Sequence, residues 1–208
     1  MNGGNIKVYF VVCKTNVMKF KPLLTLAFLF FIAFTGSECK KHKPINPVDQ
    51  LPPETQTGAN TFGCLVNGKV FLPRGPSLSP ILQCAYQYLN TDYSKGYFFQ
   101  LSAKEKGNKE CELFSVSIGT DSLQIFEGKT YPLVDYAKAN AAAQYSDYYG
   151  CGQFKDYKTS NTVVGQLFIK KFDETDQIAS GTFWFNAVDA NGDTVHVTEG
   201  RFDMQFTK

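Results

Sequence analysis

The fold class is indicated most clearly by the C-terminal stretch Ala179-Ser-Gly-Thr-Phe-Trp-Phe-Asn-Ala187, followed by Asp189-Ala-Asn-Gly-Asp193 and then Val195-His-Val-Thr-Glu-Gly-Arg-Phe-Asp-Met-Gln-Phe206. Apolar or small residues occupy every second position of the first segment, as expected for a β-strand with one buried face. The polar connection with Asn191-Gly192 is typical of a tight hairpin turn. We therefore predict two antiparallel strands joined by that turn.

The second of these strands contains a change of parity. Its apolar residues stand at odd positions first and at even positions later: Val195 and Val197, then Phe202, Met204 and Phe206. Successive side chains of a strand point to opposite faces, so one extra residue is needed to keep all five on the core face. We predict a β-bulge near Glu199-Gly200.

Upstream, residues 61–208 repeat the same pattern of short alternating stretches separated by turn signals. Tyr97, Phe99, Leu101 and Ala103 alternate with polar residues, and so do Phe114, Val116 and Ile118. Turn signals include Asn67-Gly68, Lys95-Gly96, Gly107-Asn108 and Glu127-Gly128. The pattern predicts an all-β domain, either an antiparallel β-sandwich or a closed β-barrel of about nine strands. Ala137 to Ala143 is the one candidate helix, because alanine has high helix propensity.

The N-terminal residues predict export from the cytoplasm. Lys19 and Lys21 precede an apolar run from Leu23 to Phe34, and small residues follow it. The run is too short to span a bilayer, which takes roughly 20 apolar residues, and it has the layout of a signal peptide. We assign residues 18–38 to this signal peptide and residues 1–17, upstream of Met18, to an extension from a misplaced start codon.

Cys39 is the predicted lipid anchor, since the segment Phe34-Thr-Gly-Ser-Glu-Cys39 has the form of a bacterial lipoprotein signal. Glu38 departs from the small residue usual before that cysteine, and cleavage after Ser37 is the alternative. Residues 39–60 are rich in proline and polar side chains and predict a flexible, disordered tether to the membrane. The folded domain is expected to begin at residue 61.

Composition bounds the choice of partner. The chain is 43% hydrophobic and 19% charged, as in an ordinary folded protein. Once residues 1–38 are removed, the net charge is −1. Without a basic surface there is no long-range attraction for phosphates, so we do not expect nucleic acid to be a partner.

Four cysteines remain after the anchor: Cys64, Cys84, Cys111 and Cys151. In an oxidising compartment an even set of this kind predicts disulfides, with three possible pairings. Zinc is the competing interpretation. It lacks support because the spacing is not Cys-x-x-Cys and histidine is scarce. We predict no metal and no cofactor.

Catalytic motifs are not evident. His196 lies between Val195 and Val197 and is predicted to face solvent, and no nucleophile motif accompanies it. Asp189-Ala-Asn191-Gly-Asp193 resembles the start of a calcium loop, but Gly200 stands where that loop needs a bidentate glutamate, so we favour the hairpin interpretation. Aspartates and glutamates are present, and a glycosidase with two carboxylates is therefore an open alternative.

Tyrosine is frequent, at positions 86, 88, 93, 97, 145, 148, 149 and 157. Exposed tyrosines can stack on sugar rings, which is one basis for a carbohydrate-binding face. The simpler interpretation is that these rings pack inside a β-sheet with their hydroxyls in water.

Several segments resemble uncharacterised lipoproteins of Bacteroidota: Leu51 to Lys69, Ser180 to Phe185 and Thr198 to Asp203. The resemblance implies a cell-envelope location and a β domain of unknown function, and it transfers no catalytic residue. In such lipoproteins an acidic run after the anchor cysteine is associated with export to the cell surface. Here Lys40-Lys41-His42-Lys43 follows Cys39, which implies the periplasmic side of the outer membrane.

Three functional hypotheses follow. The first is a non-catalytic envelope lipoprotein that binds a glycan or an envelope protein. The second is a carboxylate-dependent hydrolase of envelope glycans. The third is a structural β domain without a small ligand. Of these, the binding or structural role is expected.

Overall fold

A computed structural model describes residues 46–76, 79–149 and 152–208. Everything described below belongs to one compact unit, residues 44–208. The predicted signal peptide and Cys39 lie outside the described residues. No helix within the described ranges has the length and apolar character that crossing a membrane requires.

The folded unit is all-β, as predicted, with one 3₁₀ turn at Pro47–Gln50 (η1). The strands are β1 Thr61–Val66, β2 Lys69–Phe71, β3 Leu82–Asn90, β4 Lys95–Lys106, β5 Leu113–Asp121, β6 Thr130–Leu133, β7 Asn140–Tyr149, β8 Gln153–Lys158, β9 Gly165–Asp173, β10 Ile178–Val188 and β11 Thr194–Gln205.

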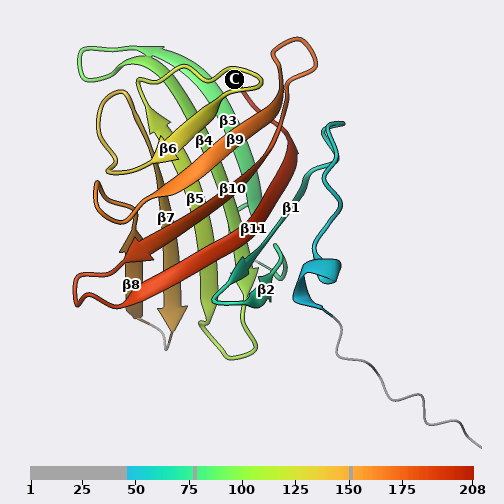
Figure 1. The fold of residues 1–208 in the computed structure, drawn as a ribbon, viewed down its shortest axis with the longest axis vertical. Coiled ribbons are helices and arrows are strands. Elements are labelled where there is room, and N and C mark those ends of the chain that lie inside the picture. Colours follow the sequence, from blue (N-terminus) through green and yellow to red (C-terminus); the bar gives the residue numbers. More distant parts are fainter. Residues whose placement is uncertain (1–45, 77–78, 150–151) are drawn as a thin grey trace, which may run out of the picture. The chain divides into compact units, whose positions relative to one another are not determined.

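All eleven strands belong to one sheet. Ten follow the order β2-β1-β11-β10-β9-β6-β7-β5-β4-β3, and β8 pairs with β7 and with the end of β10. The pairings are antiparallel except for one parallel bridge between Leu133 of β6 and Ala141 of β7. The described strands thus form one large mixed sheet, within the predicted all-β class. The sheet folds over, so that β9, β10 and β11 cross in front of β4, β5 and β7 (Figure 1).

The core lies between the two crossing halves of the sheet. Phe99 of β4 packs against Phe202 of β11, with ring centroids 6.3 Å apart. Tyr86 of β3 contacts Phe172 of β9 at 4.8 Å and Phe206 at 6.0 Å. Phe206 directly follows β11, and the other rings are inward-facing members of their strands, so the alternation seen in the sequence supplies the core.

The end of the chain ties β11 to β3. Thr207 stands two residues after the end of β11. Its carbonyl oxygen accepts a hydrogen bond from the amide of Tyr86 at 2.8 Å, and its amide donates to the carbonyl of Cys84 at 3.0 Å. These bonds satisfy backbone groups on β3, a strand at the far end of the hydrogen-bonding order from β11.

The predicted bulge is confirmed. Phe183 pairs with Gly200, whereas Phe185 pairs with Val197, so β11 places two residues opposite Trp184, one more than a regular strand would. Glu199 has a φ of 54°, the left-handed conformation that bulges often use. All five apolar residues of β11 and the residue after it are buried, as the change of parity requires.

The candidate helix over Ala137 to Ala143 is wrong. Residues 140–149 form β7, and Ala141, Ala142 and Ala143 pair with Thr120, Gly119 and Ile118 of β5. Long-range pairing outweighs the intrinsic preference of three alanines, because so short a run is too small to hold a helix in water.

Residues 46–60, predicted as part of the disordered tether, are ordered instead. The Asp203 carboxylate, completely buried on β11, accepts hydrogen bonds from this segment. The donors are the Thr55 hydroxyl at 2.6 Å, the amides of Thr57 at 2.9 Å and Gly58 at 2.7 Å, and two weaker partners, the Thr57 hydroxyl and the Ala59 amide. The buried carboxylate of Asp203 thus holds in place a segment that lies 144 to 148 residues earlier in the sequence.

Candidate binding groove

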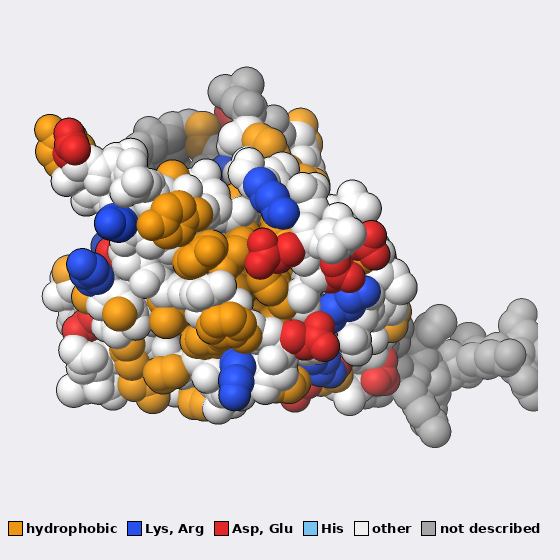
Figure 2. Space-filling view, turned by 90° about the horizontal axis from the view of Figure 1, so that it is seen from above, with side chains coloured by type: hydrophobic (Ala, Val, Ile, Leu, Met, Phe, Trp, Pro, Cys, Tyr) orange, Lys and Arg blue, Asp and Glu red, His pale blue; other side chains and the backbone are white. Residues whose placement is uncertain are grey.

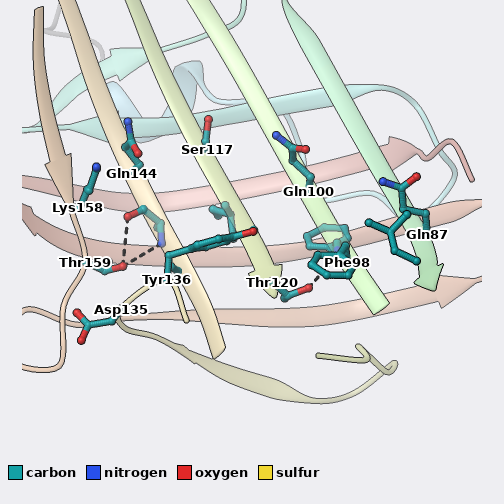
Figure 3. Close-up of a pocket in the computed structure, with 16 residues that line it drawn as sticks. Gln87, Phe98, Gln100, Ser117, Thr120, Asp135, Tyr136, Gln144, Lys158 and Thr159 are labelled. Carbon is teal, nitrogen blue, oxygen red and sulfur yellow. Dashed lines mark hydrogen bonds between the residues drawn. The ribbon is translucent and has the colours of Figure 1, made fainter. Parts of the chain in front are cut away.

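A groove with a volume of about 610 Å³ crosses the outer face of β3, β4, β5, β7 and β8. Its floor is made of outward-facing residues in consecutive register. Gln100 pairs with Gly119, Gly119 pairs with Ala142, and Ser117 pairs with Gln144. Figure 3 shows the side chains of Gln87, Gln100, Ser117 and Gln144 following one another from strand to strand.

Small residues make the depression. Gly119 and Ala142 are adjacent on the outer face and leave space where larger side chains would stand. Tyr136, on the loop between β6 and β7, lies over this space, with its ring edge 3.7 Å from the point where a Gly119 side chain would begin. Ala142 is consequently buried although it points outward.

Thr159 anchors the loop that carries Tyr136. Its hydroxyl donates to the carbonyl oxygen of Val134 at 2.6 Å and accepts from the amide of Ala143 at 3.0 Å. The two bonds join the start of the loop to β7. Figure 3 draws the bond between Thr159 and the β7 backbone. Since Thr159 is 5% exposed, the bonds are shielded from water and set the position of the aromatic ring.

The groove presents two aromatic surfaces. Phe98 projects outward from β4 beside Gln87 of β3, its partner in the register. Tyr136 is 66% exposed and covers the other part of the groove. Partial desolvation and the nearby Asp121 raise the pKa of Tyr136 above its usual value. A phenol with an ordinary or raised pKa is protonated at neutral pH and can donate a hydrogen bond.

Two glutamine side chains of the groove have unused hydrogen-bonding capacity. Ser117 donates to Ser102 at 3.4 Å and Gln144 to Ser146 at 2.9 Å. The side chains of Gln87 and Gln100, by contrast, make no hydrogen bond with any other described residue. Each of these amides offers two donors and one carbonyl acceptor to a ligand or to water.

Charge is confined to one end of the groove. Lys158 is the only cation and Asp135 the only carboxylate among its described lining residues. The Asp135 carboxylate accepts a hydrogen bond from the side-chain amide of Asn161. The remaining lining is neutral, with Phe98, Leu89 and Tyr136 next to hydroxyls and amides. Such a surface suits a ligand with both apolar faces and hydroxyl groups.

The predicted disulfides are corrected in part. Cys64 of β1 and Cys84 of β3 are free and buried in the core. Burial raises the pKa of Cys84 to about 12 and also that of Cys64, to which Glu105 adds a further upward shift. Both thiols therefore behave as inert core residues. Cys111 is disulfide-bonded, and Cys151 lies outside the described residues.

The hairpin interpretation of residues 189–193 fits the structure. Asp189 Oδ1 accepts from the amides of Asn191 at 2.9 Å and Asp193 at 2.8 Å, which closes the turn. Lys155 Nζ lies 2.7 Å from Asp193 and 3.7 Å from Asp189, so an ammonium group occupies the space between the carboxylates. His196 faces solvent, as predicted, with its Nδ1 2.7 Å from Asn186 Oδ1.

Several tyrosines follow the packing interpretation: Tyr86 and Tyr145 are buried. Others are exposed, including Tyr88, Tyr93, Tyr148 and Tyr149. Sequence reasoning did not identify the groove residues. The available signal was a set of glutamines at outward positions of neighbouring stretches, but only the register shows that Gln87, Gln100 and Gln144 share one surface.

Comparison with known proteins gives one match. Residues 105–204 match the family model described as a domain of unknown function, DUF6252. The matched range holds β5 to β10 and nearly all of β11, and thus one part of the groove, but it leaves out β3. No curated protein and no solved structure matches the chain. The comparison therefore supports an uncharacterised domain and transfers no activity.

Proposed function

We propose that this protein is a non-catalytic lipoprotein of the cell envelope whose groove on β3, β4, β5, β7 and β8 binds a neutral stretch of an envelope glycan. The observation that carries the proposal is the pairing of two aromatic surfaces, Phe98 and Tyr136, with the unpartnered amides of Gln87 and Gln100. A sugar ring has an apolar C–H face for stacking and hydroxyls for amides, so one ligand class uses both features.

The dimensions of the groove favour a chain rather than a single ring. It runs across five strands, and neighbouring strands lie about 4.8 Å apart, which makes the path about 19 Å long. Several sugar rings fit such a length. A strongly anionic polymer is a poorer match, because Lys158 is the one cation among the described lining residues.

The absence of a second carboxylate supports binding over hydrolysis. Glycoside hydrolysis needs two carboxyl groups across the bond to be cut. Among the described residues that line the groove, Asp135 alone carries one, and it is bonded to Asn161. Nothing in this groove specifically favours the carboxylate-dependent hydrolase.

The envelope location rests on the N-terminal sequence. A basic and then apolar stretch ending at Cys39 supports lipid anchoring, and Lys40-Lys41-His42-Lys43 supports the periplasmic face of the outer membrane. Mass spectrometry of the membrane fraction tests this part. We expect Cys39 to be the first residue and to carry acyl mass, whereas an unmodified chain beginning at Glu38 contradicts the anchor.

Binding is tested by calorimetric titration of the purified full-length protein with chitotetraose, cellotetraose and maltotetraose. Gln87→Ala should weaken binding of the preferred sugar about tenfold, the value of one or two hydrogen bonds. Gln83→Ala is the matched control, because Gln83 lies on the same strand and the same outer face but does not line the groove. Equal affinities of the two variants, or no binding of any of the three sugars, contradict the proposal.

A further inference from the structure

A second groove lies on the outer face of β9, β10 and β11. Its volume is about 340 Å³, and its lining includes Phe168, Thr182, Trp184 and Arg201. The strands β9, β10 and β11 lie on the opposite side of the core from β4, β5 and β7 (Figure 1). Their outer face therefore points away from the first groove. The groove on β3 to β8 and this one therefore share no lining residue.

Trp184 is the central feature of this groove. It is the one tryptophan of the chain and is 41% exposed, although its neighbours Phe183 and Phe185 are buried in the core. In the register it stands opposite Gln166 of β9. A large aromatic ring thus points outward from the middle of a strand, next to a side-chain amide that makes no hydrogen bond within the described part of the chain.

The bulge in β11 builds the other wall. It places two residues, Thr198 and Glu199, opposite Trp184, where a regular strand would place one. Gly200 makes this possible, since a Cβ there would lie 2.4 Å from the ring of Phe183. Glu199, which has a left-handed backbone conformation, lines the groove, and its carboxylate lies 3.2 Å from Arg201 Nη2.

The charged groups of this groove are paired with one another. Arg201 binds Glu199, and Glu54, on the segment before β1, is paired with Lys170 of β9. The groove therefore has carboxylate acceptors and guanidinium donors in set positions but no unpaired charge among them. This arrangement suits hydroxyl groups, which can donate to a carboxylate and accept from a guanidinium, and gives no advantage to a charged ligand.

We propose that this second groove binds a pyranose ring of a neutral glycan, stacked on the indole of Trp184 and hydrogen-bonded by the Glu199–Arg201 pair and the Gln166 amide. The C–H face of the sugar contacts the electron-rich face of the indole, and adjacent hydroxyls bridge the carboxylate and the guanidinium. The site does not depend on the first groove. If both are occupied, one molecule joins two glycan chains on opposite faces, and its avidity for a glycan network rises.

Trp184 provides its own test, because the emission of the only indole in the chain reports this groove. The purified full-length protein is titrated with chitotetraose, cellotetraose and maltotetraose while tryptophan emission is recorded. We expect a saturable change with at least one sugar. Glu199→Gln and Gln166→Ala should each weaken that response at least fivefold, whereas Asn186→Ala should not, since Asn186 faces outward on β10 but does not line the groove.

The same titration distinguishes binding in the second groove from binding in the first. The emission response should persist in Gln87→Ala, which affects only the first groove, even if calorimetry detects no binding there. An unchanged emission spectrum up to millimolar concentrations of all three sugars overturns the second site. So does an equal response of Glu199→Gln, Gln166→Ala and Asn186→Ala. Urea midpoints close to that of the unmodified protein establish that the variants are folded.

Discussion

The two outer faces of this sheet differ in how their polar groups are satisfied. On β11, the outward carboxylate of Asp203 is completely buried beneath residues 55–59 and accepts five hydrogen bonds from them. On β3 and β4, the amides of Gln87 and Gln100 lie in an uncovered groove without an intramolecular partner. The surroundings of Asp203 are completed by the chain itself, whereas the groove around Gln87 and Gln100 is left for a ligand or for water.

The difference teaches how to separate structural from binding residues in a domain without a recognised activity. A buried charge with a full set of donors stabilises the fold, and removing it is costly. An amide at the surface with free donors contributes little to folding. Substitution of Asp203 should therefore change the free energy of unfolding, whereas substitution of a groove glutamine should change the affinity for a ligand.

The largest expected effect is that of Asp203→Ala. The change leaves the amides of Thr57, Gly58 and Ala59 without their acceptor, and we expect the free energy of unfolding to fall by about 3 kcal/mol. Urea denaturation measures the loss. Asp92→Ala, at an exposed position between β3 and β4, is the control and should change stability little. Comparable losses in both variants would refute the structural role of Asp203.

The next effect is that of Gly200→Ala. The added methyl group meets the Phe183 ring at 2.4 Å, and overpacking of this kind costs about 2 kcal/mol. Thermal unfolding measures the change. Gly192→Asn is the control: Gly192 is open to solvent with a φ of 88°, which asparagine tolerates. If Gly200→Ala is as stable as this control, the bulge is not packed as described.

A smaller effect concerns the loss of folding stability at acid pH. Burial alone would raise the pKa of Asp203, but the hydrogen bonds from Thr55, Thr57, Gly58 and Ala59 outweigh it and hold the pKa below its usual value. The carboxylate therefore stabilises the fold above the unfolded-state pKa of about 3.9, and this stabilisation is lost as the pH falls through the lower folded-state pKa. Asp203→Asn should lose less stability between pH 7 and pH 3 than the unmodified protein, as urea midpoints at the two pH values will measure. An identical pH dependence would assign the acid sensitivity to other groups.

The smallest expected effect on stability is that of Gln100→Ala in the open groove. Its side chain has no partner within the described ranges, so the free energy of unfolding should change by less than about 0.5 kcal/mol. The affinity for the preferred tetrasaccharide should nevertheless fall, as calorimetry will detect. A large loss of stability instead would place Gln100 with Asp203 among the structural residues and end the contrast between the faces.

Local pattern predicted much of the fold but little of the candidate sites. The bulge near Glu199-Gly200 was predicted because the parity of five apolar residues changes within one strand. The helix at Ala137 to Ala143 was wrong because a local preference was set against pairing with β5, which the sequence does not display. Cys64 and Cys84 were predicted to be bonded, yet each packs as a free thiol in the core.

By itself, the sequence determined which side chains of each strand face inward, since alternation has a period of two and is legible within a few residues. Only the tertiary structure decided which strands are neighbours. That choice brings Gln87, Gln100 and Gln144 onto one surface, and it brings Asp203 under residues 55–59. The physical reason is that pairing and burial are settled by contacts between residues far apart in the chain, whose energies depend on the whole packed arrangement.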